Sequence, residues 1–204
     1  MKKIIAMLLV LTMALSLAAC SGNDKTPETT PETTPVETTV SEPATATAVE
    51  LLQNIFNAYA EEERPPLCGG SGDTANFEGP GAIAITDTDA LQYALLVPEA
   101  QLSIITDAAS MGHMMNANSL TVGAFKIDGD VDAFVNAYKD AVVNNQWMCG
   151  FPDKVVFYSV DGYILMAYGK AGMADSMGDF LNPLADAIAT AYPTATLIAE
   201  ADLM

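Results

Sequence analysis

The chain has 204 residues and a formal charge of −18 at pH 7, because 26 acidic side chains outnumber 8 basic ones. Such an excess of negative charge repels phosphate backbones, so the composition excludes nucleic acid as a partner. Half of the residues are hydrophobic, and the chain beyond the first 47 residues is long enough for one domain with a core of its own.

The first 20 residues resemble the signal of a bacterial lipoprotein. Lys2 and Lys3 precede an apolar run over residues 4–19, and Cys20 follows two small alanines. A charged start and a short apolar stretch are typical of an export signal rather than of a membrane-spanning helix. We therefore expect lipidation of Cys20, which attaches the chain to the extracytoplasmic face of the cell membrane. The alternative is an ordinary cleaved signal with a chance cysteine.

Residues 21–47 predict a disordered tether behind this anchor. They contain a repeat of proline, glutamate and threonine over residues 27–35 and almost no large hydrophobic residue. Such a composition buries too little surface to compensate for the entropy lost on folding. Prolines favour an extended conformation of about 3.1 Å per residue, so the segment can span roughly 80 Å. We expect a single folded domain, residues 48–204, at the end of this tether.

Helix signals begin the domain. Thr47 lies three residues before a glutamate, which is the spacing of a capping box, and the apolar positions behind it recur with a helical period. This pattern predicts a helix that continues to about Glu62. The glycine-rich residues 67–82 predict a loop, residues 87–97 a short helix, and residues 102–109 fit either a strand or a helix.

The middle of the domain predicts a strand and a second helix. Residues 120–127 are rich in β-branched and aromatic side chains, which are typical of a strand. A turn at Asp128 and Gly129 follows. Asp130 is expected to cap a helix that continues to about Gln146.

A hairpin and a last helix complete the predicted elements. Apolar residues 155–160 and 163–168 flank an Asp-Gly pair, which is the strongest local signal for a two-residue hairpin turn. A helical pattern then runs over residues 173–188, where Pro183 must kink or break it and Asn182 is expected to cap the second part. The order of elements predicts an α+β fold, in which amphipathic helices cover an antiparallel sheet that contains the central hairpin.

Three segments of this region have a recognisable pattern: MMNAN at residues 114–118, VGAFK at 122–126 and NQWMCGFP at 145–152. With the hairpin that follows, residues 113–170 resemble the core of an uncharacterised lipoprotein family of Gram-positive, largely anaerobic bacteria, a domain of unknown function. The resemblance implies a lipid-anchored extracytoplasmic domain. It implies no activity, so it identifies no catalytic residue.

Two cysteines remain in the domain when Cys20 carries lipid. Cys68 and Cys149 form an even pair in an exported chain, which favours a disulfide bond. A bridge across this separation would stabilise the fold by about 4–5 kcal/mol in the chain-entropy model. Two reduced thiols are the alternative.

A cluster near the middle of the chain offers the ligands that copper(I) prefers. Met111, His113, Met114 and Met115 supply thioethers and the only imidazole of the chain. The alternative is that these methionines fill gaps in the hydrophobic core. Soft-metal handling is therefore a second candidate function, and beyond it the sequence indicates no cofactor.

No set of nucleophile, base and oxyanion-binding group can be assembled from the sequence. We therefore expect a binding or envelope-assembly protein, with an envelope or cell-wall partner, rather than an enzyme; a small envelope hydrolase is a third candidate. Asn116, Asn118 and Trp147 are the candidate interaction residues, because amides bond a partner's backbone and tryptophan is a common interface anchor. The alternatives are that the asparagines cap turns and that Trp147 closes the core.

Overall fold

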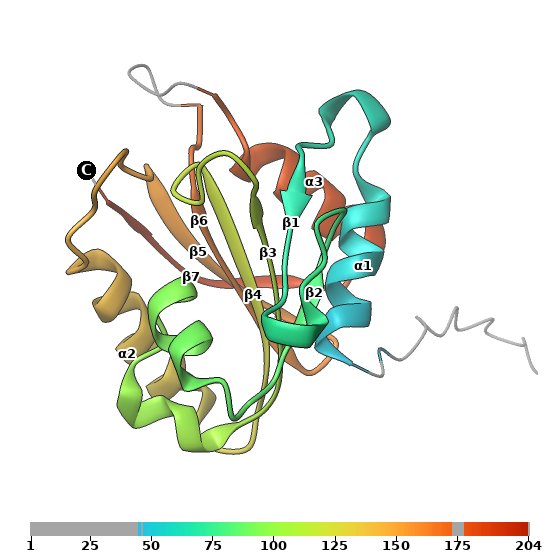
Figure 1. Ribbon diagram of the computed structural model, residues 1–204. Coiled ribbons are helices and arrows are strands. Elements are labelled where there is room, and N and C mark those ends of the chain that lie inside the picture. The colour runs from blue at the N-terminus through green and yellow to red at the C-terminus, as the bar shows by residue number, and fades with distance from the viewer. Residues whose placement is uncertain (1–44, 46, 173–177, 204) are drawn as a thin grey trace, which may run out of the picture. The chain divides into compact units, whose positions relative to one another are not determined.

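The fold is α+β, as the sequence predicts: helices pack on both faces of a seven-stranded antiparallel sheet (Figure 1). The computed structural model describes residues 45, 47–172 and 178–203. They belong to one compact unit, Val40–Met204. The predicted signal with its Cys20, and nearly all of the predicted tether, lie outside the described residues.

The sheet has the strand order β1–β3–β4–β6–β5–β7, with β2 paired to β3 beside β1. All neighbouring strands are antiparallel. The strands are β1 (Leu67–Cys68), β2 (Gly81–Ile83), β3 (Ile105–His113), β4 (Leu120–Ile127), β5 (Lys154–Val160), β6 (Tyr163–Gly169) and β7 (Thr196–Asp202). The strand predicted over residues 120–127 is confirmed and lies at the centre of the sheet.

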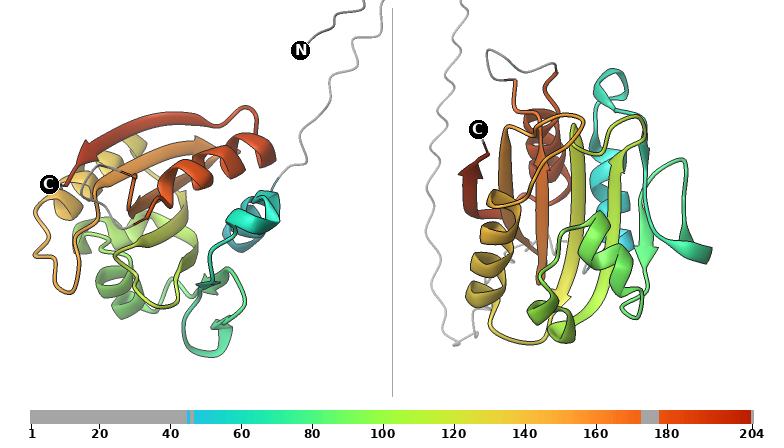
Figure 2. Two further views of the ribbon diagram at one scale, coloured as in Figure 1. Left: turned by 90° about the horizontal axis from the view of Figure 1, so that it is seen from above. Right: turned by 60° about the vertical axis from the view of Figure 1, so that its left-hand side comes forward.

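Helices form a layer on each face of the sheet. They are α1 (Ala48–Ala58), α2 (Val131–Val143) and α3 (Leu181–Ala191), with short helical turns η1 (Glu61–Glu63), η2 (Gly72–Thr74), η3 (Ala90–Ala94) and η4 (Glu99–Ile104). α1 and α3 pack on one face, and α2, η3 and η4 pack on the other (Figure 2). Each layer encloses a hydrophobic core made by residues of this unit, so residues 40–204 have what a domain needs to fold alone.

The predicted hairpin is confirmed in both register and turn. Val160 pairs with Tyr163 across Asp161 and Gly162, and the φ angles of these two turn residues, 47° and 78°, are those of a type I′ turn. β4 and β7 pair with the outer sides of the hairpin. The hairpin is therefore internal to the sheet, as its two apolar faces require.

The chain enters the domain at the end of the sheet that carries the hairpin turn. The backbone N–H of Thr45 donates to the carboxylate of Asp161. The backbone N–H of Ala48, at the start of α1, donates to Asp107 at 2.6 Å. These contacts lie at the lower end of the sheet in Figure 1.

The two predicted helix starts are confirmed, but both helices end about one turn early. Thr47 accepts a hydrogen bond from the N–H of Glu50 at 3.2 Å, and Asp130 caps α2 by accepting from Ala133 at 3.0 Å. α1 ends before the three glutamates of η1, because negative charges are unfavourable at the negative end of a helix. α2 ends before two asparagines, which favour caps and turns over helix interiors.

The last helix differs from the prediction. Residues 173–177 lie outside the described residues, and α3 begins only at Leu181, with Pro183 in its first turn. A proline does not break a helix at this position, since N–H groups of the first turn have no acceptor within the helix. Asn182 is inside the helix rather than its cap, and its N–H donates to Asp179 at 3.2 Å.

Several strands were not predicted. β1 and β2 are short strands within the expected loop 67–82, and the open segment 102–109 contains the start of β3. β7 forms an edge of the sheet, beside β5. Its side chains are largely exposed, and its apolar run is only three residues long, Leu197 to Ala199, which is too short to predict a strand.

Candidate binding site

Two loops meet at the end of the sheet opposite the hairpin turn: the β3–β4 loop and the α2–β5 loop. Asn118 of the first loop donates to the carbonyl oxygens of Met148 and Gly150 in the second, at 2.8 and 2.9 Å. Asn116 adds a longer bond of 3.3 Å to the carbonyl oxygen of Cys149. The two side-chain amides therefore hold the loops together.

These bonds give the two asparagines a structural role. Their amide NH₂ groups satisfy carbonyl groups of their own chain, and Asn116 Oδ1 also accepts from the backbone N–H of Asn118 at 3.0 Å. This is the turn-forming behaviour expected of asparagine. The alternative interpretation of Asn116 and Asn118 as turn-forming residues fits these bonds, whereas their role in an interaction surface stays a prediction.

The backbone beside these loops adopts unfavourable conformations. Cys149 has φ = 62°, and Leu96, which follows η3, has the same value. The left-handed region costs a residue with a side chain roughly 1–2 kcal/mol. η3 is itself a π-helix, closed by a bond of 3.2 Å from the N–H of Leu95 to the oxygen of Ala90. Strained residues and π-helical turns concentrate at functional sites. The surface between η3 and the α2–β5 loop is therefore a candidate for such a site.

A pocket of about 290 Å³ lies between η3 and the α2–β5 loop. We call it the Trp147 pocket. Its aromatic and amide side chains are Tyr93, Trp147, Tyr168, Asn118, Asn145 and Gln146. Among the described residues that line the pocket there is no charged side chain, although the chain carries 26 acidic ones.

Trp147 belongs both to the core and to the pocket. Its ring packs edge-on against buried Tyr168, with 5.0 Å between ring centroids, and it contacts the core beneath α2. The indole N–H is buried and has no hydrogen-bond acceptor in the described part of the protein. Leaving such a donor unsatisfied costs about 1–3 kcal/mol. The opposite wall is Tyr93, which is 77% exposed.

A second hollow of about 220 Å³ adjoins this pocket, and both are lined by Ala94 and Ala117. We call it the Cys68 hollow. Beside this hollow the backbone of Gly69 and Gly70 packs closely against β3. A Cβ atom at Gly69 would lie 1.9 Å from the carbonyl oxygen of Ser110, and the N–H of Gly70 donates to Ser110 Oγ at 2.9 Å. Gly69, in the segment predicted as a loop, is therefore required by this close approach.

A buried ion pair fixes the strand ends beside the two loops. The carboxylate of Asp153 is fully buried and accepts from Lys170 Nζ at 3.0 Å and from the N–H of Ala171 at 2.9 Å. The backbone N–H of Asp153 donates to Gly169 at 2.8 Å, and its carbonyl oxygen accepts from Leu203 at 2.9 Å. These bonds join the start of β5, the end of β6 and the end of β7.

A third hollow, of about 280 Å³, lies between α3 and the edge of the sheet and differs in chemistry. Lys154 bonds to Glu200 at 3.1 Å and approaches Asp202 at 3.8 Å there. The hydrogen bond to Glu200, more than any other effect, raises the pKa of Lys154 above its usual value. These charges are therefore engaged with one another, which makes this hollow a weaker candidate for ligand binding.

The predicted disulfide is not present in the structure, where Cys68 and Cys149 are both free thiols. Cys68 is half-buried in β1 opposite Gly112, whereas Cys149 is exposed at the strained position of the α2–β5 loop.

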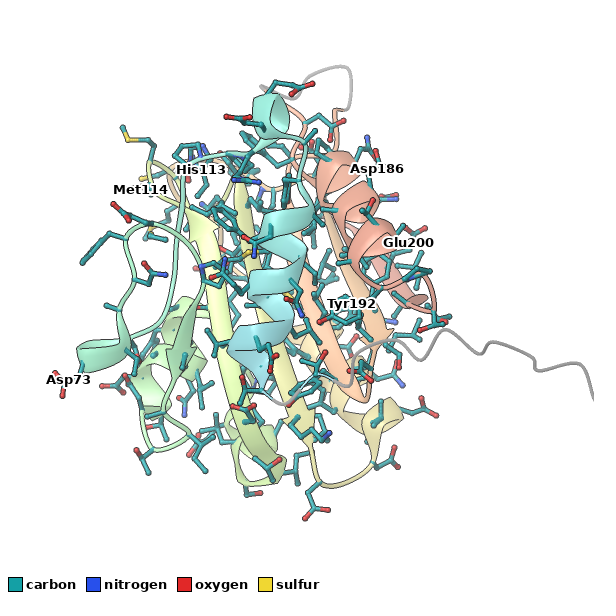
Figure 3. All side chains as sticks on the ribbon, turned by 90° about the vertical axis from the view of Figure 1, so that its right-hand side faces the viewer. Asp73, His113, Met114, Asp186, Tyr192 and Glu200 are labelled. Atoms are coloured by element: carbon teal, nitrogen blue, oxygen red, sulfur yellow. The ribbon has the colours of Figure 1, made fainter. Side chains whose placement is uncertain are left out.

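The soft-metal candidates do not form a ligand set. Met111 is fully buried in the core beneath α1, Met115 is 84% exposed, and His113 Nδ1 accepts two backbone N–H groups, from Met115 at 3.2 Å and Asn116 at 3.4 Å. No group of three His, Cys, Asp or Glu side chains that could hold a metal occurs within the described residues. In Figure 3 the labelled carboxylates lie well apart from His113.

Comparison with known proteins gives no relative: no family model, no curated protein and no solved structure matches the chain. The family resemblance of residues 113–170 thus stays a prediction. In the described part of the chain, no helix has the length and hydrophobicity needed to span a bilayer.

Proposed function

We propose that this protein is a lipid-anchored, extracytoplasmic binding domain that recognises a ligand of the cell envelope through the Trp147 pocket without transforming it. The anchor is supported by the pattern of residues 1–20 and by the resemblance of residues 113–170 to lipoproteins. The location and the partner class follow from these sequence features alone, whereas the binding site is argued from the geometry.

The observation that carries the proposal is the coincidence of an aromatic pocket with strained walls. Of the three non-glycine residues with positive φ among the described residues, Leu96 lines the pocket and Cys149 directly follows Met148, which lines it. Such conformations persist only where the surrounding structure maintains them, and they concentrate at binding and active sites. Exposed Tyr93 and half-buried Trp147 supply the aromatic surface that ligand pockets commonly use.

The lining of the pocket supports binding rather than catalysis. General acid–base chemistry needs a group such as histidine, a carboxylate or lysine within reach of the substrate. The described residues around the pocket offer amides, aromatic rings and small apolar side chains instead. The lone histidine is engaged elsewhere, since His113 Nδ1 accepts backbone hydrogen bonds and its ring packs edge-on against Phe180 at 5.1 Å.

Co-sedimentation with cell-envelope fragments of the producing bacterium tests this proposal. We expect the domain, residues 40–204, to sediment with the fragments, and Tyr93→Ala to weaken this binding about threefold to tenfold through the loss of aromatic contact. Ile85→Ala is the matched control, because it truncates another exposed apolar side chain that lines neither the pocket nor the Cys68 hollow. Equal binding by the wild type and Tyr93→Ala, with equal melting temperatures, would refute the assignment of this site.

A further inference from the structure

We infer that the ligand of the Trp147 pocket is an uncharged oligosaccharide. This inference rests on the proposed function of the pocket and specifies the ligand class. The argument uses three properties of the site: its lack of charge, the pairing of aromatic rings with amides, and its continuation into the Cys68 hollow.

The charge distribution selects a neutral ligand. Residues 48–204 contain 5 basic and 21 acidic side chains, so the domain repels anions approaching any part of its surface. A cationic ligand would be bound best by carboxylates, but none is among the described residues that line the pocket or the hollow. The pocket and the hollow together form an uncharged surface on an acidic domain, and such a surface is suited to binding an uncharged molecule.

The remaining side chains match the two surfaces of a sugar. A pyranose ring has C–H faces that stack on aromatic rings, and Tyr93 and Trp147 provide such rings on the two walls. Its hydroxyl groups each donate and accept, and an amide does the same through its NH₂ and its oxygen. Asn145 and Gln146 present amides at the edge of the pocket, and Gln146 is exposed.

The shape of the site favours a chain of sugar rings over an extended peptide. The two adjoining hollows, about 290 and 220 Å³, share Ala94 and Ala117 as lining residues, so together they form a site longer than either hollow alone. Peptides that bind in extended form typically add a strand to a sheet edge through backbone hydrogen bonds. The Trp147 pocket instead lies against Tyr168 of the internal strand β6. The Cys68 hollow reaches the edge strand β1, but there the backbone N–H and carbonyl groups of Gly69 already bond to Asn76, both at 2.8 Å.

The indole N–H of Trp147 adds an energetic argument. It is buried without an acceptor, so the unliganded domain retains an unsatisfied donor. Trp147 also lines the pocket, so a ligand bound there contacts this residue. Binding is therefore expected to change the surroundings of the indole ring.

Fluorescence titration of the domain tests the inference, because Trp147 is the only tryptophan of the chain. The probes are the trisaccharides of glucose and of N-acetylglucosamine, the trisaccharide of galacturonic acid as the anionic comparison, and an uncharged capped peptide. We expect a saturable change in emission with at least one neutral trisaccharide, and binding of the anionic one at least about tenfold weaker. Tyr93→Ala and Gln146→Ala should each weaken the binding about threefold to tenfold, whereas Ile85→Ala should leave it unchanged.

The outcomes separate this inference from the proposed function. Equal binding of the neutral and the anionic trisaccharides would overturn the inference. A response to the peptide alone, or envelope binding that depends on Tyr93 without a response to any saccharide, would overturn the inference and leave the proposed function intact. If neither the envelope fragments nor any probe binds, both fail. Calorimetry with the same probes replaces fluorescence if the emission of Trp147 proves insensitive.

Discussion

The ion pair between Asp153 and Lys170 allows a sharp test of the packing at the binding end of the sheet. The two partners differ in burial: the Asp153 side chain is fully buried, whereas the Lys170 side chain is 17% exposed. Lys170→Met therefore deprives a buried carboxylate of its cation. Asp153→Asn removes the anion from Lys170, whose side chain can still reach water. The asparagine retains a side-chain oxygen that can accept from the N–H of Ala171.

This asymmetry sets the expected magnitudes. Removal of one partner of a buried pair typically costs about 3–5 kcal/mol, because the other charge stays desolvated, and this range applies to Lys170→Met. For Asp153→Asn we expect about 1–3 kcal/mol, the cost of a lost charge-assisted hydrogen bond. The double variant should be more stable than Lys170→Met alone, since it removes both charges.

Urea denaturation of the domain, followed by the emission of Trp147, measures the three free energies of unfolding. Each kcal/mol should also lower the melting temperature by about 2–4 °C for a chain of this size. A larger loss for Asp153→Asn than for Lys170→Met, or a double variant no more stable than Lys170→Met, would refute the reasoning from burial.

The remaining predictions concern the turn, the tyrosines and the anchor. Gly162→Ala should destabilise the domain by about 1–2 kcal/mol because its φ is 78°, whereas Gly112→Ala, where a Cβ meets only ordinary contacts from 3.4 Å, should change stability by less than about 0.5 kcal/mol. Burial raises the pKa of Tyr138 and Tyr168 above the usual value, so the folded state retains protons that the unfolded chain loses. Stability should then be complete below about pH 10 and fall above it, by up to about 1.4 kcal/mol per pH unit for each such tyrosine, which a denaturation series against pH measures. Cys20→Ala should move the protein out of the membrane fraction, and an unlipidated wild type in the medium would refute the anchor.

The elements that the sequence predicts correctly are those with local causes. The hairpin depends on two adjacent residues, Asp161 and Gly162, whose positive φ angles determine the turn. The start of α2 depends on Asp130 and a backbone group three residues away. The edge strand β7 has only a weak local signal, since the residues of the strand that pack on the core, Ala199 and Ala201, are small, and its partner β5 lies about 40 residues earlier in the chain.

The binding site is the part that sequence reasoning found least. Of the residues that line the Trp147 pocket, only Trp147 and Asn118 are candidate interaction residues in the sequence, and Asn118 also holds the two loops together. Tyr93 lies 54 residues from Trp147 in the chain, and nothing local to either indicates that η3 packs beside the α2–β5 loop. The one local signal is a tyrosine in a short predicted helix that must end before Pro98.

The positions of the chain entry and the binding loops have a mechanical consequence. Thr45 contacts the hairpin turn at one end of the sheet, and the loops held by Asn118 lie at the other end, beyond the full length of β6. If the anchor pulls on the first end while a ligand is held at the second, the tension runs lengthwise along the central strands. The hydrogen bonds of an antiparallel ladder lie perpendicular to that direction, so they are loaded together in shear rather than opened one after another. If the proposed anchor and ligand are correct, this orientation favours a domain that remains folded under such a load.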